Sequence, residues 1–513
     1  MDGAWTYRQL QAAVAEAAAW LSEQGVRPGD RVLLVSENCR AYVALLLATA
    51  RLDAWPVLAN ARLAAAEIEA IERHATARRV IFTRSRLAER HAAQRGAPYA
   101  AAGLLGEIAA GPRNETAEPE PLAADAASRV GVVIYTSGTT GTPRGVMLSH
   151  RGLLFAARTA AEIRGFSGQD RLLGALPMTH SSGLSLVLLA GLAAGSSIWV
   201  LPRFDPVAAL GALQGQAVSV FTGAPAMYAQ LLEYIRYRGL GPQRLPALRL
   251  LTACSSPLTA ELKSGVEQMF GTVLHNGYGA TECSPGIAST RLESPRADTS
   301  VGSAYPGVEV RLVAEGGGPA EPGQPGEVWV RGPNIMLGYY RAPEDTAAVL
   351  DAEGWFHTGD LGRFEAGNLH VLGRSKEMII RFGFNVYPAE VEAVLETHPA
   401  VRRAAVVGVP APEAEGGESL IAFMEPEPGA VEDPPLALYL SQRLASYKQP
   451  AQVVAVEELP LTPTGKIRKA ELRGQWLAAA ARPTSGRPDA TGSSPTPRED
   501  RGAPTGAGSR EGR

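Results

Sequence analysis

Residues 135–145 of the chain read Tyr135-Thr136-Ser137-Gly138-Thr139-Thr140-Gly141-Thr142-Pro143-Arg144-Gly145, and an apolar run, Val132–Tyr135, leads into them. A strand that enters a loop of small residues, hydroxyl groups and one cation presents many donors to the oxygens of a polyphosphate. The loop lacks the terminal Gly-Lys-Ser/Thr of a P-loop. It predicts phosphate binding, although a loop rich in Gly and Thr is, taken alone, equally compatible with a flexible polar turn.

Strands and helices are expected to alternate on both sides of this loop. A capping box formed by Thr6 and Gln9 predicts the start of the first helix. Leu184–Leu201 has roughly the length of a membrane span, but glycines and serines interrupt it, and it favours a buried helix followed by a strand at Ile198–Leu201. Short apolar runs predict further strands at Arg31–Val35, Val80–Phe82, Val132–Tyr135, Val218–Phe221 and Leu248–Leu251. This alternation indicates an α/β fold with largely parallel sheets and no transmembrane segment.

The character of the sequence changes toward the C-terminus. Gly- and Pro-rich turns separate expected strands at Val308–Val313 and Val328–Val330, and a helix is expected at Pro388–Thr397. We predict a large N-terminal domain over residues 1–373, built of parallel-type α/β subdomains and a β-rich subdomain. A small mobile α+β domain over residues 374–480 and a disordered tail over residues 481–513 are expected to follow.

Composition excludes several kinds of protein. The chain has 513 residues, 45% of them hydrophobic and 20% charged, with a net charge of −3. Neither a nucleic acid nor an anionic membrane surface is expected as the main partner. The three cysteines are too few for a disulfide framework or a zinc site, and no secretory signal is visible, so a cytoplasmic location is expected.

Residues 135–145 closely resemble the signature loop of the superfamily of AMP-forming acyl-CoA synthetases, peptide-synthetase adenylation domains and luciferases. The resemblance continues from about Trp5 to Leu472. It implies that the loop binds ATP through Thr136, Ser137, Gly138, Thr139, Thr140, Gly141 and Arg144. Arg144 stands where the family generally has lysine, so the positive charge is kept while its geometry changes.

Further motifs of this superfamily follow in the expected order. Asn276-Gly277-Tyr278-Gly279-Ala280-Thr281-Glu282 resembles the second core motif, in which Tyr278 lies near the adenine and Thr281 meets the α-phosphate. The resemblance implies Thr139 and Glu282 as Mg²⁺ ligands. It also implies Asp360 and Arg374 as ribose contacts, Lys376 as the interdomain hinge, Gly383 beside coenzyme A, and Lys466 as the catalytic lysine.

The acid substrate is less defined. Pro177–Gly183 resembles the segment that gates the acyl pocket, with His180 as a catalytic or pocket residue and no aspartate to pair with an amino acid's ammonium group. Phe221, Cys254, Ser255 and Gly279 are the other expected pocket residues. A fatty or other aliphatic acid is the first choice because that class is broad. Small dicarboxylic and aryl acids remain alternatives.

Together these motifs predict an enzyme that forms an acyl-adenylate from ATP and a carboxylic acid, with Mg²⁺, and then an acyl-CoA. Transfer to the thiol of an acyl carrier protein is an alternative. A nucleotide-binding homologue without catalysis is a third, which the motif residues argue against. Relatives carry further residues before the segment that begins at Trp5, so the oligomeric state stays open, with a homodimer among the alternatives.

Overall fold

The structure is a computed structural model, and it does not describe every residue. The side chains of a few further residues, including Ser137 and Arg374, are also outside the description. The described residues are 3–137, 143–256, 258, 260–314, 316–374, 379–382, 384–386, 388–411, 417–427, 429, 434–460, 467 and 469–480.

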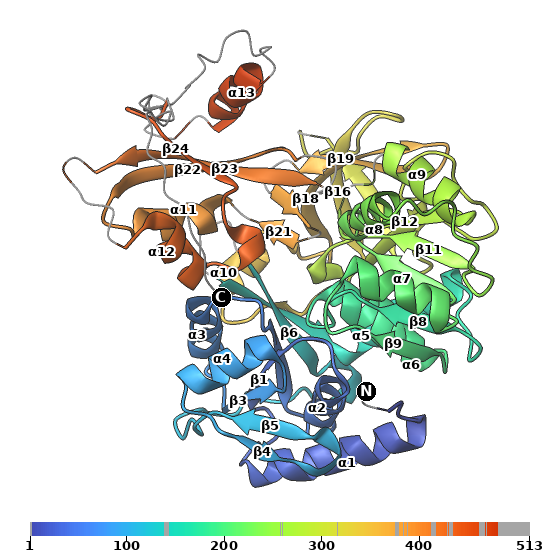
Figure 1. Cartoon of the computed structure of the whole chain (residues 1–513), viewed down its shortest axis with the longest axis vertical. Helices are drawn as coiled ribbons and strands as arrows, with labels where there is room; N and C mark the ends of the chain where they lie inside the picture. Colours follow the sequence, from blue (N-terminus) through green and yellow to red (C-terminus); the bar gives the residue numbers. More distant parts are fainter. Residues whose placement is uncertain are drawn as a thin grey trace, which may run out of the picture.

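An eight-stranded sheet forms the first part of the large domain (Figure 1). Its central strands β6, β2, β1 and β3 are parallel, and their residues alternate between two cores. Val32 and Leu34 face α1 and α2, whereas Leu33 and Val35 face α3 and α4. The order is β17-β7-β6-β2-β1-β3-β5-β4, from β1 (Arg31–Ser36), β2 (Trp55–Asn60), β3 (Arg79–Thr83), β4 (Tyr99–Ala101), β5 (Glu107–Ala110), β6 (Val130–Ser137), β7 (Pro143–Ser149) and β17 (Gly338–Tyr339). Its helices are α1 (Tyr7–Glu23), α2 (Arg40–Arg51), α3 (Ala65–Ala75) and α4 (Arg86–Gln94).

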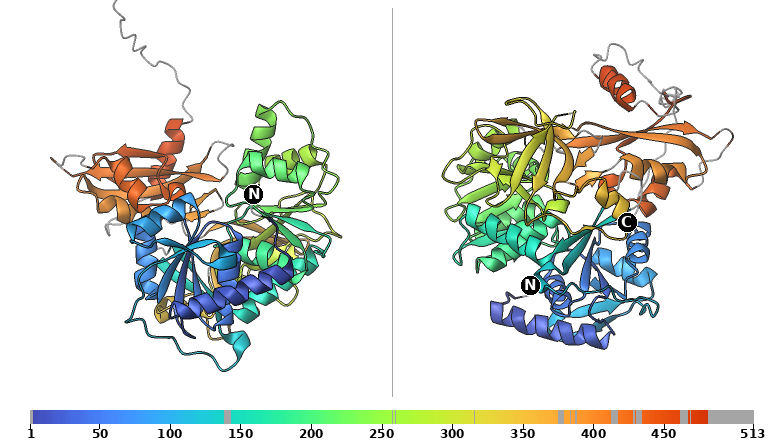
Figure 2. Two further views of the ribbon diagram at one scale, coloured as in Figure 1. Left: turned by 60° about the horizontal axis from the view of Figure 1, so that its bottom comes forward. Right: turned by 180° about the vertical axis from the view of Figure 1, so that it is seen from behind.

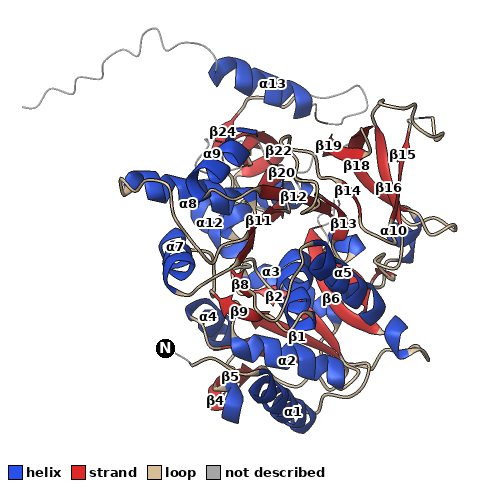
Figure 3. Cartoon of the chain, turned by 90° about the vertical axis from the view of Figure 1, so that its right-hand side faces the viewer, coloured by secondary structure: helices blue, strands red, loops and turns tan. Residues whose placement is uncertain are grey.

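A seven-stranded sheet forms the second part, and its strands also lie between helices (Figure 3). One face shares a core with the first sheet, while the other packs against α7, α8 and α9. The order is β14-β13-β12-β11-β10-β8-β9, from β8 (Arg171–Gly174), β9 (Ser197–Val200), β10 (Val220–Gly223), β11 (Leu250–Ala253), β12 (Leu274–Gly279), β13 (Gly286–Ser289) and β14 (Ser303–Ala304). Its helices are α5 (His150–Ile163), α6 (Ala190–Ala193), α7 (Pro206–Gly215), α8 (Pro225–Tyr237) and α9 (Ala260–Phe270). Because the two sheets share one continuous core, they form a single body.

A four-stranded antiparallel sheet completes the large domain. It joins β15 (Glu309–Val313), β16 (Gly326–Arg331), β18 (Phe356–Glu365) and β19 (Asn368–Arg374), with the short helix α10 (Pro343–Ala347) nearby in the chain. The β-rich segment expected after Val308 is therefore confirmed.

The small C-terminal domain lies against the large one, close to α3 (Figures 1 and 2). Alternate residues of its central strands pack toward α11 and α12 on one face and toward α13 on the other. Its elements are β20 (Ile379–Arg381), β21 (Phe384–Val386), α11 (Pro388–Glu396), β22 (Val401–Pro410), β23 (Glu418–Pro426), α12 (Leu436–Arg443), β24 (Gln452–Ala455) and α13 (Lys469–Ala480). The boundary between residues 373 and 374 stays a prediction, and residues 481–513 are outside the described part.

The local sequence expectations are largely confirmed. Thr6 caps α1, and its capping box with Gln9 is complete. Gly183–Leu189 forms a π-helix that continues into α6, and β9 follows. The interrupted apolar run is therefore a helix and a strand. Among the described residues, no helix is long and apolar enough to cross a membrane.

Candidate active site

The predicted phosphate loop joins two antiparallel strands, β6 and β7. Tyr135 of β6 is paired with Gly145 of β7, and Thr136 with Arg144, so Thr136 and Arg144 stand opposite one another where the loop leaves the sheet. The Tyr135 hydroxyl lies 2.7 Å from His74 Nδ1, which anchors β6 to α3. Residues 138–142, which include the predicted ligands Gly138, Thr139, Thr140 and Gly141, are outside the described residues, and Ser137 is described only in its backbone.

Arg144 connects this loop to the second motif. Its Nη2 donates to Asp345 Oδ1 at 2.8 Å, and its guanidinium lies 5.4 Å from the centre of the Tyr339 ring. The Tyr339 hydroxyl in turn donates to Glu282 Oε1 at 2.9 Å. A chain of contacts therefore links the phosphate loop to the predicted metal ligand.

The second motif ends β12 and enters a short helical turn, Thr281–Cys283. Thr281 Oγ1 lies 3.2 Å from Ser181 Oγ, a neighbour of His180 in the chain. Asn276 is buried and donates from Nδ2 to the carbonyl of Thr299 at 2.9 Å, so its side chain fixes the backbone of the motif. The structure thus places Thr281 beside the segment that resembles the acyl-pocket gate.

Tyr278 and Asp360 come from different sheets and meet at the end of β12. The Tyr278 hydroxyl donates to Asp360 Oδ2 at 2.5 Å, and Asp360 is 4% exposed. Burial, together with the adjacent Asp360 carboxylate, raises the pKa of Tyr278 well above its usual value, so the phenol stays a donor. Asp360 is also paired with Arg374 across β18 and β19, which brings both predicted ribose contacts together in the backbone.

His180 lies under the small domain. Burial, assisted by the positive charges of Lys448 and Arg62, lowers the pKa of His180 to about 4, so the imidazole is neutral near pH 7. Its ring meets the edge of Phe384 from β21, with ring centres 5.0 Å apart, and Phe384 stacks on Tyr447. A residue of the small domain therefore covers a predicted pocket residue of the large domain.

An ion pair holds the two domains together at the same side. Lys448 Nζ donates to Glu67 Oε1 at 2.6 Å, and the backbone N–H of Ala445 donates to Glu67 Oε2 at 2.9 Å. The two charged side chains are only 8% and 11% exposed. This pair could not be predicted from the sequence, because a glutamate in the first turn of a helix is also an ordinary capping residue.

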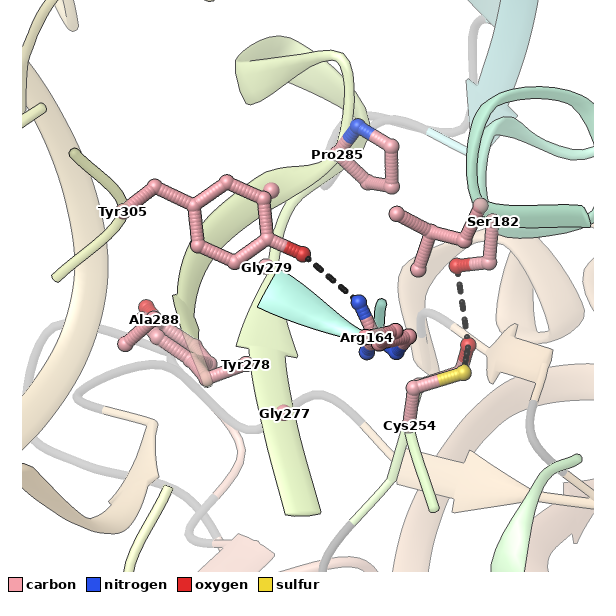
Figure 4. A pocket seen from close by; sticks show the side chains of 12 residues that line it. Arg164, Ser182, Cys254, Gly277, Tyr278, Gly279, Pro285, Ala288 and Tyr305 are labelled. Carbon is pink, nitrogen blue, oxygen red and sulfur yellow. Dashed lines mark hydrogen bonds between the residues drawn. The ribbon is translucent and has the colours of Figure 1, made fainter. Parts of the chain in front are cut away.

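A small cavity lies beside the second motif (Figure 4). The predicted pocket residues Cys254, Ser255 and Gly279 line it, as do Ser182 and Tyr278. Ser182 Oγ lies 3.0 Å from Ser255 Oγ. Phe221 is fully buried in the core, against Phe204 and Tyr228, and does not line this cavity.

The sequence reasoning did not find Arg164 and Tyr305, which also line the cavity. Arg164 follows the last residue of α5, and Tyr305 lies just after β14. Neither belongs to a motif, and only the tertiary structure brings them together. No pattern in the sequence could have singled them out.

Glu282 is suited to a magnesium site in which the phosphates of a bound nucleotide supply further ligands. Mg²⁺ in such sites is bound by one or two carboxylates and by substrate phosphates, so a protein cage is not required. Accordingly, no group of three or more His, Cys, Asp or Glu side chains that could hold a metal occurs in the described part of the chain. The hydrogen bond from Tyr339 uses one Glu282 oxygen and leaves lone pairs on the carboxylate.

Three further predicted residues cannot be placed. Lys466, Lys376 and Gly383 are outside the described residues, and the side chain of Arg374 is as well. Their roles stay predictions from the resemblance.

Comparison with known proteins identifies the family. Residues 1–340 match the family described as AMP-binding enzyme, and residues 390–466 match the AMP-binding enzyme C-terminal domain. The chain is 37% identical over 480 residues to the feruloyl-CoA synthase of Amycolatopsis sp, covering 92% of this chain and 94% of the relative. It is 32% identical over 490 residues to 4-coumarate–CoA ligase 5 of Oryza sativa subsp. japonica, covering 92% and 90%. The structure of the amide bond synthetase McbA from Marinactinospora thermotolerans is similar, with a TM-score of 0.79, 31% identity, and coverage of 92% and 96%.

The protein belongs to the AMP-binding enzymes, the superfamily of adenylate-forming acyl-CoA synthetases. Its enzyme class is that of the acid–thiol ligases.

Proposed function

We propose that this protein activates a carboxylic acid with ATP as an acyl-adenylate and then transfers the acyl group to the thiol of coenzyme A. The contact between Tyr278 and Asp360 carries the proposal, because it joins the predicted adenine and ribose contacts from two separate sheets. Thr281 and Glu282 follow Tyr278 at once in the chain. Residues with the chemistry for an adenylate are therefore gathered beside a cavity for an acid.

In the first step a carboxylate oxygen of the acid attacks the α-phosphorus, and the bond from that phosphorus to the bridging oxygen breaks. Pyrophosphate leaves with the electron pair. Asp360 would accept hydrogen bonds from the ribose hydroxyls, and Thr281 would donate to an oxygen of the α-phosphate. Lys466 would bring positive charge to the same phosphate. Mg²⁺, held by Glu282, Thr139 and phosphate oxygens, would reduce the repulsion between the two anions.

In the second step the thiol of coenzyme A loses its proton to solvent and its sulfur attacks the carbonyl carbon of the adenylate. The bond from that carbon to the phosphate oxygen breaks, and AMP leaves with the electron pair. The contact between Phe384 and His180 supports this step, because the resemblance places the segment around Gly383 beside the acceptor thiol. Neutral His180 would take part through packing and hydrogen bonding, since its lowered pKa keeps it uncharged. Lys376 would be the hinge between the two steps.

The identity of the acid is a finer question. A fatty or other aliphatic acid is the broad first choice from the sequence. The lining of the cavity supports the dicarboxylic and aryl alternatives, because it includes the polar side chains of Arg164, Ser182, Ser255 and Tyr305. Hydrocarbon chains prefer walls without such groups.

The test is a panel of short, long-chain, aromatic and dicarboxylic acids, each incubated with the full chain, ATP and Mg²⁺. Release of pyrophosphate and of AMP is followed with and without coenzyme A. We expect AMP release that depends on coenzyme A with one class of acid, and loss of pyrophosphate release in Lys466→Ala. Pyrophosphate release that leaves coenzyme A unconsumed would favour a carrier-protein acceptor. ATP binding without turnover of any acid would contradict the proposal.

A further inference from the structure

Arg164 is a buried cation in the wall of the cavity. Its side chain leaves the C-terminal end of α5, and the residue is 3% exposed. Figure 4 shows its head group between Tyr305 on one side and Cys254 with Ser182 on the other. A buried guanidinium loses the water that would solvate its charge, so its protein partners decide whether the charge is compensated.

The described groups that contact this guanidinium are neutral. Nε lies 3.4 Å from Thr252 Oγ1, and Nη1 donates to the Tyr305 hydroxyl at 3.2 Å. Within the described part of the chain, no Asp or Glu lies within ion-pair distance of Arg164, and Nη2 has no hydrogen-bond acceptor. Arg249, close by, shows the contrast, because its Nε and Nη2 both donate to the carboxylate of Asp170 at 2.8 Å.

The surroundings add to the positive charge. Arg291 donates to the backbone carbonyls of Ser289 and Ala304, at 2.8 and 2.6 Å, and forms no ion pair with a described residue. Burial and the charge of Arg164 together lower the pKa of His275, which keeps that histidine neutral near pH 7. The end of the cavity near Arg164 therefore holds positive charge that no ion pair among the described residues compensates.

The Nη2 atom of Arg164 lies beside Gly277 in the wall of the cavity. Nη2 lies 3.5 Å from the position that a Cβ would take on Gly277, so the glycine leaves it open to the cavity. Gly277 precedes Gly279 by two residues on β12, which corresponds to about 7 Å along a strand. A carboxylate that meets Thr281 would lie beyond the Gly279 end of β12, whereas Arg164 lies at Gly277.

We infer that Arg164 selects acids that carry a second oxygen acceptor at the end remote from the reacting carboxylate. This inference rests on the proposed function, since the cavity must hold the acid. An ionised carboxylate or a phenol oxygen would accept from Nη2, and a carboxylate would also compensate the charge. A hydrocarbon end would leave the cation without an acceptor, because it offers no lone pair.

The experiment compares kcat/KM for two matched pairs of acids with the full chain, ATP, Mg²⁺ and coenzyme A. The pairs are 4-hydroxycinnamic with cinnamic acid, and octanedioic with octanoic acid. We expect the wild-type protein to prefer the oxygen-bearing member of at least one pair by about tenfold or more. The pair that shows the preference identifies the source of the oxygen as a phenol or a carboxylate.

Arg164→Met is expected to abolish this preference, whereas Arg158→Met, at an exposed position of α5, should keep it. The readout is a ratio measured within one protein preparation, so a partial loss of folded protein cancels. If Arg164→Met does not fold, Arg164→Lys keeps the charge and should keep the preference for the anionic member. Equal efficiency or preference for the unsubstituted member in both pairs would overturn the inference, as would an unchanged ratio in Arg164→Met. Absence of turnover with every acid would instead contradict the proposed function.

Discussion

Glu67→Gln removes the negative charge that the small domain contacts on α3 while keeping the size of the side chain. In the wild-type protein this carboxylate accepts from Lys448 Nζ at 2.6 Å and from the backbone N–H of Ala445 at 2.9 Å. It also accepts from the N–H of Ala64, at 2.8 Å, as the cap of α3. A glutamine has a single acceptor oxygen, so its amide nitrogen must face at least one of these donors.

The magnitude follows from the burial of the pair. The side chains of Glu67 and Lys448 are 11% and 8% exposed, so solvent screens their attraction little. One hydrogen bond to a charged group contributes about 1.5–3 kcal/mol. Loss of that contribution lowers the equilibrium constant for docking of the small domain on the large one by roughly 10- to 150-fold, because about 1.4 kcal/mol corresponds to a factor of ten.

The assay separates the two half-reactions. Pyrophosphate release reports adenylation, and AMP release on addition of coenzyme A to the preformed adenylate reports thioester formation. We expect Glu67→Gln to slow the second rate by tenfold or more and to leave the first within about twofold of wild type. Hydrogen exchange at the Ala445 amide should also become faster, because its acceptor is weakened.

Glu89→Gln is the matched control. It makes the same substitution in an ion pair with Arg84 whose side chains are 42% and 53% exposed, and an exposed pair contributes little. Both half-reactions should be unchanged in this variant. The reasoning is refuted if Glu67→Gln slows both half-reactions equally, or if Ala445 exchanges at the wild-type rate.

Two further predictions concern stability. His275 is buried and its pKa is lowered to about 4, mainly by burial, so between pH 6.5 and 4 the unfolded chain binds a proton that the folded chain does not. The stability that neutral His275 contributes is fully present above pH 6.5 and falls as the pH falls, by about 2 kcal/mol at pH 5. The free energy of unfolding in urea should therefore differ less between pH 7 and pH 5 in His275→Gln than in the wild-type protein. A Cβ on Gly183 would stand 2.2 Å from the carbonyl oxygen of Pro177, so Gly183→Ala should lower stability by about 1–3 kcal/mol in the same assay. Gly211→Ala, in α7 with open space around it, is the control and should raise stability by about 0.5–1 kcal/mol; a similar loss in both variants would contradict the steric explanation.

The sequence predicted those parts of the fold whose signal is local. The capping box of α1 and the buried strand β1 follow from the residues that form them, and both are confirmed. The run Val218–Phe221 shows the limit, because Val218 is buried although β10 begins at Val220. Apolar residues mark what is buried, whereas the ends of a strand depend on where its neighbours offer hydrogen bonds.

The candidate site likewise contains residues that the sequence could predict and residues that it could not. Tyr278 and Asp360 belong to contiguous motifs, so the sequence could nominate them, and the structure brings them into contact. Arg164, Tyr305, Glu67 and Lys448 carry no motif, and the meaning of each depends on a partner far away in the chain. Residues whose role arises from long-range packing could not be predicted from one sequence.

The cavity is lined by residues between 164 and 305, and none of the described residues of the small domain lines it. The two sheets that surround it share one core, so a movement of the small domain would leave the shape of the cavity unchanged. The large domain would then select the acid by itself, and the small domain would act on an acyl group that is already selected. A chimera with the C-terminal domain of a relative should therefore retain the acid preference of this chain and change only its handling of the acceptor thiol.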